Sequence, residues 1–168
     1  MFPFCFLTAD SIKFTNKYYL EPYLEFLKSE EKNGVVGFDI ENRIPWEGYM
    51  QKTNAFEITP SKDFINFDYL RLKQVDICRN FFLAKTIVLY LNKWDENLKL
   101  CEHEDWAWRL KTETSYKVFY SALIRGYYIN DKPDQYLKLR NRCYQEFKKF
   151  LLKKWNIVAP FRLRKEIK

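Results

Sequence analysis

The order of strand-like and helix-like patterns is the feature that most constrains the fold of this chain. Residues 4–7 form an apolar run typical of a short buried strand, and residues 20–32 place apolar side chains on one face of a helix. Asn33-Gly34 ends that helix, and residues 35–40 resemble a second buried strand. A strand, a helix and a strand in succession predict an α/β fold, in which ligands bind beyond the carboxyl ends of the strands.

The rest of the chain continues this alternation. Residues 41–63 contain prolines and a glycine without a sustained period, which indicates a long loop or a hairpin that would cover a site. The expected elements that follow are a strand at 71–78, a buried segment at 81–84, helices at 85–91 and 104–112, a strand at 116–120 and the longest helix at 133–155. The helical period of the last element predicts that Tyr136, Leu139, Cys143, Phe147, Phe150 and Leu151 face inward, and that Lys138, Arg142, Lys149 and Lys153 face outward.

Length and composition favour one folded domain. A chain of 168 residues supports one core, and 47% hydrophobic residues exclude a disordered protein. The net charge of +7 suits an anionic partner, and residues 158–168 read as a basic tail behind a domain at 1–157. The four cysteines lack the CxxC spacing of thiolate metal sites, so two disulfides and four free thiols both remain open. No apolar stretch is long enough to predict a transmembrane segment.

A cluster of acidic residues and tryptophans at 101–110, CEHEDWAWRL, is the strongest candidate for a site. It contains three acids, two indole rings and the only histidine of the chain. Carboxylates can bind or deprotonate sugar hydroxyls, while an indole ring covers the apolar face of a pyranose. The alternative is structural, because acidic residues stabilise the first turn of a helix. The cluster therefore indicates either a sugar-handling site or an ordinary helix start.

The segment from 75 to 110, with its FFLAKT, WDE and EHEDWAWRL motifs, resembles the acceptor-side half of GT-A glycosyltransferases. The likeness is greatest to the β-1,4-N-acetylgalactosaminyltransferase-like and related family 2 enzymes, and it extends over residues 4–150. It implies a partial GT-A fold, a Rossmann-like mixed sheet flanked by helices. It also implies that the family's N-terminal nucleotide-binding part would precede this segment, so the chain is expected to be N-terminally truncated.

The resemblance assigns roles to the residues of the cluster. Asp105 matches the aspartate that takes the proton from the acceptor hydroxyl in inverting members, and Glu104 would hold an acceptor hydroxyl. Trp106 and Trp108 stand where the family has aromatic residues that pack on the sugar, and His103 is expected to be a polar group of the same substrate site.

The segment FLTADSIKFT at 6–15 resembles the family's DXD segment, whose paired aspartates hold Mn²⁺ or Mg²⁺ against the diphosphate of the nucleotide sugar. Asp10 matches the last acid, whereas Thr8 and Ala9 replace the first two. Asp10 is thus the expected metal ligand, and its binding of manganese alone would be weak.

The resemblance predicts transfer of a hexose or N-acetylhexosamine from a nucleotide sugar to a glycan, with inversion. The rival hypothesis is a catalytically inactive fragment, a subunit that needs a partner, or a glycan-binding protein of the same fold. Relatives of this type work in the Golgi lumen, although no signal or anchor is recognisable in this sequence. The hypothesis of a nucleic-acid-binding module is supported only by charge and aromatic content, so no nucleic-acid partner is expected.

Overall fold

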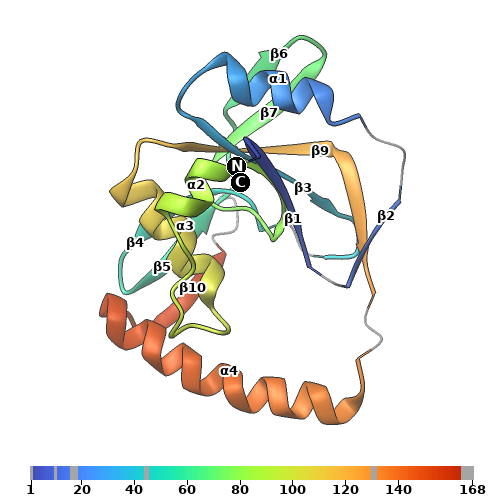
Figure 1. Cartoon of the computed structure of the whole chain (residues 1–168). Coiled ribbons are helices and arrows are strands. Elements are labelled where there is room, and N and C mark those ends of the chain that lie inside the picture. Colours follow the sequence, from blue (N-terminus) through green and yellow to red (C-terminus); the bar gives the residue numbers. More distant parts are fainter. Residues whose placement is uncertain (1, 10, 16–18, 44–45, 130–131, 164–168) are drawn as a thin grey trace.

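A mixed sheet flanked by helices forms the centre of the computed structural model, which describes residues 2–9, 11–15, 19–43, 46–129 and 132–163 (Figure 1). The described strands of this sheet are, in spatial order, β1 (Phe4–Thr8), β8 (Phe81–Lys85), β3 (Asn33–Ile40), β9 (Lys117–Tyr128), β7 (Leu70–Val75) and β6 (Phe64–Phe67), and β2 (Ile12–Phe14) pairs with β9. The helices are α1 (Glu21–Ser29), α2 (Thr86–Leu91), α3 (Glu102–Glu113) and α4 (Asp134–Trp155). The α/β class expected from the sequence is confirmed, in one domain consistent with a partial Rossmann-like fold.

Strand directions bring several strand ends to one edge of the sheet. Strands β3 and β9 are parallel, with Val36 opposite Phe119. Strand β8 runs antiparallel to both β3 and β1, so β1 has the same direction as β3. Strands β1, β3 and β9 therefore finish at the edge where β8 begins. This edge is where an open α/β sheet binds its ligands.

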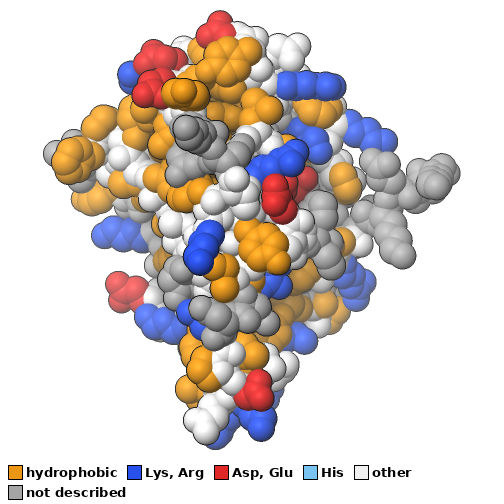
Figure 2. All heavy atoms as spheres, turned by 90° about the vertical axis from the view of Figure 1, so that its right-hand side faces the viewer, with side chains coloured by type: hydrophobic (Ala, Val, Ile, Leu, Met, Phe, Trp, Pro, Cys, Tyr) orange, Lys and Arg blue, Asp and Glu red, His pale blue; other side chains and the backbone are white. Residues whose placement is uncertain are grey.

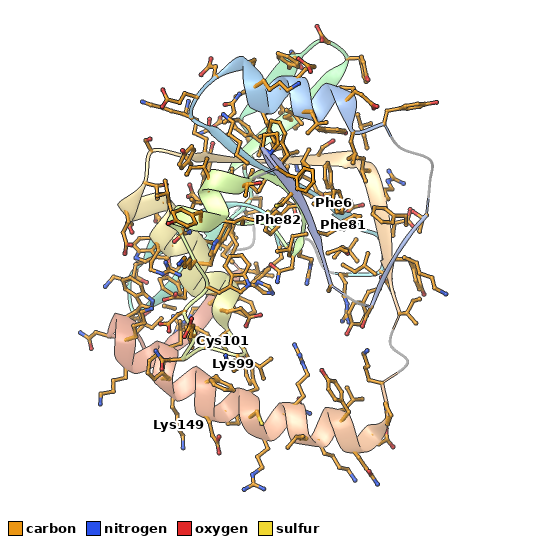
Figure 3. All side chains as sticks on the ribbon, viewed as in Figure 1. Phe6, Phe81, Phe82, Lys99, Cys101 and Lys149 are labelled. Atoms are coloured by element: carbon orange, nitrogen blue, oxygen red, sulfur yellow. The ribbon has the colours of Figure 1, made fainter. Side chains whose placement is uncertain are left out.

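The two faces of the sheet are covered by different elements. On one face, Tyr23, Phe26 and Leu27 of α1 pack against alternate residues of the central strands. On the other face, α3 and a smaller sheet pack against the intervening residues. The neighbours Phe81 and Phe82 of β8 belong to these opposite faces (Figure 3). Each fully buried side chain of this kind stabilises the fold by about 1.5–3 kcal/mol.

Gly37 in the middle of β3 leaves no room for a side chain. A Cβ atom there would lie 2.5 Å from Cys78 Cβ and 2.6 Å from Cys78 Sγ. Gly37→Ala is therefore expected to lower the free energy of unfolding by about 1–3 kcal/mol, the usual effect of overpacking, measured by urea denaturation. Combining it with Cys78→Gly should recover part of the loss. A single variant as stable as the wild type would contradict this account of the contact.

The second, smaller sheet consists of β4 (Tyr49–Lys52), β5 (Ala55–Thr59) and β10 (Ala159–Leu163). Strands β4 and β5 pair as a hairpin, which decides the alternative left open for residues 41–63. Strand β10 pairs in parallel with β5, so residues 159–163 of the segment predicted as a basic tail form a strand. Pairing with a strand about a hundred residues away leaves no local sequence signal. Strand β6 was also not expected from the sequence.

Helix α4 differs most from its sequence-based prediction. Of its six residues expected to face inward, only Leu151 is buried, and Tyr136, Leu139 and Phe150 are exposed. The carboxyl-terminal half of the helix packs on the core through Leu151 and Trp155. Its amino-terminal half runs beneath the ends of β2 and β9, away from the main sheet (Figure 1). Lys138, Arg142, Lys149 and Lys153 are exposed, as expected.

The structure bears on two further expectations, the state of the four cysteines and the absence of a predicted transmembrane segment. All four cysteines are free thiols, and Cys78 and Cys101 are buried. In the described part of the chain, none of the helices combines the length and the apolar character needed to cross a bilayer.

Candidate functional site

A cleft of about 680 Å³ lies between α4 and the edge of the main sheet where β1, β3 and β9 end. This volume is within the range of sites that bind small molecules and cofactors. Residues at the ends of three strands line it, including Ala9 after β1, Ile40 at the end of β3 and Tyr128 at the end of β9. The start of α3 and the first turns of α4 form the remaining walls. The cleft thus occupies the position that the strand order predicts.

The first turn of α3 brings polar side chains to the cleft. The chain enters the helix through Cys101, which has a φ of 63° and a side-chain hydrogen bond with Tyr144 of α4. Cys101 lies between α3 and α4 (Figure 3). Glu102, His103 and Glu104 follow and all line the cleft. His103 and Glu104, which were expected to belong to one site, therefore line the same cleft.

Two residues that line the cleft each have a buried polar atom without a hydrogen-bond partner within the described structure. The atoms are Oε2 of Glu104 and Nε1 of Trp46. Glu104 is only 4% exposed and Trp46 only 8%. A buried polar group without a partner costs about 1–3 kcal/mol, so such groups are rare unless a ligand or water completes them. One is an acceptor and the other a donor, which suits a ligand that carries hydroxyl groups.

Burial changes the protonation of the α3 side chains. It raises the pKa of Glu104 to about 7, with a further contribution from the negative charge of Glu102. It also raises the pKa of Glu102. Burial lowers the pKa of His103 to about 4, and the positive charges of Arg79 and Arg140 act in the same direction. At neutral pH, His103 is uncharged and Glu104 is poised to accept or release a proton.

Basic side chains reach the cleft from three separate segments. Arg43 follows β3, Arg79 precedes β8, and Lys132 and Arg140 come from the α4 region. The guanidinium of Arg43 lies 3.8 Å from the centre of the Tyr128 ring, and that of Arg79 lies 5.6 Å from the Trp46 ring. Figure 2 shows the face at the right-hand side of Figure 1, where Lys and Arg side chains lie among hydrophobic ones. The cleft therefore combines positive charge with aromatic surface.

Aromatic residues of the cleft come from segments outside the 101–110 cluster. The Trp46 ring contacts both His103, at 5.8 Å between ring centres, and Phe161 of β10, at 5.4 Å. Tyr136 and Tyr144 of α4 also line the cleft. Trp46 lies in a segment read as loop, and Tyr136 was assigned to the core by helical period. The sequence signal that could have identified Tyr136 is the apolar face of α4, which extends beyond the part of the helix that packs on the core.

Asp105, the expected base, does not line the cleft. Its side chain is fully buried on another side of α3. Oδ1 accepts hydrogen bonds from Trp155 Nε1 at 2.8 Å and Lys154 Nζ at 2.7 Å, and Oδ2 accepts one from Arg109 Nε at 2.9 Å. Three donors leave the carboxylate engaged in joining α3 to the end of α4. This geometry corrects the expectation that Asp105 faces the acceptor.

The two tryptophans of α3 are packing residues rather than sugar platforms. Trp106 is buried, stacks on Phe82 with 5.6 Å between ring centres, and donates from Nε1 to Asn92 O at 2.6 Å. Trp108 packs against Phe56 of β5, with 5.5 Å between ring centres. Neither lines the cleft. The expectation that Trp106 and Trp108 contact substrate is therefore corrected, and the tryptophan that lines the cleft is Trp46.

Comparison with protein-family models, curated proteins and solved structures finds no match to this chain. The site must therefore be interpreted from its own chemistry.

The described residues do not fit a manganese site. Asp10, the expected metal ligand, lies outside the described residues. Thr8 and Ala9 supply no carboxylate, and the hydroxyl of Thr8 donates to the carbonyl of Ala9 at 3.2 Å. Among the residues that the structure describes, no three His, Cys, Asp or Glu side chains converge as metal ligands would. Mn²⁺ and Mg²⁺ require several oxygen ligands, so we assign no step to a metal ion.

Proposed function

We propose that this chain is the acceptor-side part of a GT-A-type glycosyltransferase that transfers a hexose or an N-acetylhexosamine from a nucleotide sugar to a glycan. The observation that carries the proposal is that Glu104 and Trp46, which line one cleft at the carboxyl ends of the strands, each have a buried polar atom without a partner, Oε2 and Nε1. A sugar hydroxyl can donate to the first and accept from the second. The aromatic walls suit the apolar face of a pyranose.

Glu104 takes the role of base in this proposal, in place of Asp105. Its carboxylate accepts the proton of the acceptor hydroxyl while that oxygen forms a bond to the anomeric carbon of the donor. The bond from the anomeric carbon to the diphosphate breaks at the same time, which inverts the centre. A pKa of about 7 suits this role, because a general base works best when its pKa is near the working pH. The Glu104 carboxylic acid then releases the proton to solvent.

A glycan-binding protein without transfer activity is the second candidate. It is favoured by Thr8 and Ala9, which stand in place of two acids of the DXD segment, and by Asp105, whose carboxylate already has three donors. The cleft, its aromatic walls and its unpartnered atoms would serve glycan binding equally well.

Incubation with a panel of nucleotide sugars and glycan acceptors tests the proposal. We expect transfer or donor hydrolysis with at least one donor, and a rise in melting temperature with the matching nucleotide diphosphate. Trp46→Phe, which keeps an aromatic ring but removes the N–H, should raise KM for the acceptor by about 2–10-fold, the effect of one hydrogen bond. Glycan binding without turnover would favour the second candidate. The absence of binding and turnover alike would remove both.

A further inference from the structure

Three arginine residues line the cleft, and their arrangement indicates how the cleft could bind an anion. Arg43 lies just after β3, where its backbone N–H donates to Ile40 O at 3.0 Å. Arg79 lies just before β8, where its carbonyl accepts from Phe81 N at 2.7 Å. Arg140 lies on α4, across the cleft from the sheet edge. Three elements that are distant in sequence thus each direct a guanidinium group to one cleft.

These arginines lie close enough to influence one another and the α3 side chains. The charge of Arg43 contributes to lowering the pKa of Arg79, after the larger effect of burial. The charges of Arg79 and Arg140 both lower the pKa of His103. Gathering like charges in a partly buried cleft costs free energy. A bound anion would offset that cost.

Among the described residues that line the cleft, bases outnumber acids. The described lining residues include four bases, Arg43, Arg79, Lys132 and Arg140, and two acids, Glu102 and Glu104. The negative charge of Glu47, which is outside this lining, also acts on Arg79 and raises its pKa. The pKa of each acid is raised, that of Glu104 to about 7, so at neutral pH the acids carry less than their full negative charge. His103 is neutral and adds nothing.

Guanidinium groups favour phosphate among anions. An arginine presents several N–H donors in a planar fork that fits phosphate oxygens in pairs, and it does so without a metal ion. The cleft of about 680 Å³ is larger than a single phosphate group needs, so the anion can be one part of a bigger ligand. The described residues also lack the carboxylate set that a divalent cation would require.

We propose that Arg43, Arg79 and Arg140 bind the phosphate groups of the ligand directly, so that this cleft takes a diphosphate without a divalent metal ion. The inference rests on the proposed function, in which a diphosphate is the leaving group, but it can be tested apart from transfer. Guanidinium charge then stabilises the departing diphosphate in the role that a metal would have in a complete DXD site.

Calorimetric titration of the whole chain in EDTA tests the inference, with inorganic pyrophosphate, orthophosphate and uridine diphosphate as separate probes. We expect pyrophosphate and uridine diphosphate to bind without metal, and more weakly as the salt concentration rises. Arg43→Ala and Arg140→Ala should each weaken binding about 10-fold or more, the effect of losing one charge-assisted contact. Both residues are exposed, so these variants should fold.

Lys149→Ala provides the matched control. Lys149 is an exposed base on the same helix as Arg140 and points away from the cleft (Figure 3). Its replacement should leave pyrophosphate binding unchanged. Equal losses in the Lys149 and Arg140 variants, or binding that requires Mn²⁺, would overturn the inference. Metal-free binding of pyrophosphate that depends on Arg140, without transfer to any acceptor, would support it and reject the transferase proposal.

Discussion

Asp105→Asn is expected to lower the free energy of unfolding by about 3–5 kcal/mol, the cost of removing one partner from a buried ion pair. The carboxylate of Asp105 is fully buried and accepts from Arg109, Lys154 and Trp155. Asparagine keeps one acceptor oxygen but has no charge to offset the two cations. Urea denaturation at neutral pH measures the loss. Any activity that disappears in this variant is then explained by weakened attachment of α3 to α4.

Asp95→Asn is the matched control for Asp105. Asp95 also pairs with Lys154, at 2.6 Å, but its side chain is 16% exposed. Its loss should cost only about 1 kcal/mol, as for pairs near the surface. If Asp105→Asn were as stable as the wild type and yet inactive, the structural role argued for this residue would be wrong. Asp105 would then return as the candidate base.

The main elements of the fold were predictable because each leaves a local pattern. The apolar run at 81–84 and the helical period at 104–112 correspond to β8 and α3. Strand β10 was not predictable, since its partner β5 is about a hundred residues earlier in the chain. The apolar side of α4 was predictable, but what it faces was not. Tyr136 and Tyr144 line a cleft, and a sequence pattern does not distinguish an apolar face on a cleft from one on a core.

The sequence predicted the acidic cluster of the candidate site, but it did not show which of its carboxylates lines the cleft. Glu104 and Asp105 are neighbours, and successive side chains of an α-helix point about 100° apart, so the two carboxylates point in different directions. Which one faces the cleft is decided by α4, whose Lys154 and Trp155 bind Asp105. The three arginines come from separate segments that only the fold brings together. The acidic cluster was therefore found, and its basic counterpart was not.

Glu104→Gln is expected to stabilise the protein at pH 8 by about 3 kcal/mol. The pKa of Glu104 is raised in the folded state from its ordinary value of 4.5 to about 7, a difference of about 2.5 units at 1.36 kcal/mol each. Because the folded state binds the proton more tightly, the stabilisation by protonation is complete below pH 4.5 and is lost as the pH rises through 7. Glutamine carries no charge at any pH, so the variant avoids that loss. Urea denaturation of both proteins at pH 4 and pH 8 should show the difference only at pH 8.

The same variant should lose transfer activity by about 10²–10⁴-fold, the usual contribution of a general base. Glu102→Gln is the control, because Glu102 lies in the same turn of α3 and also lines the cleft but has a side chain that is 19% exposed. It should change stability and transfer much less. A stability gain that is the same at pH 4 and pH 8 would contradict the burial of a titrating carboxyl at position 104. If one substitution at position 104 raises stability and abolishes activity, Glu104 has a chemical role. Replacing a residue that serves only packing would lower stability and activity together.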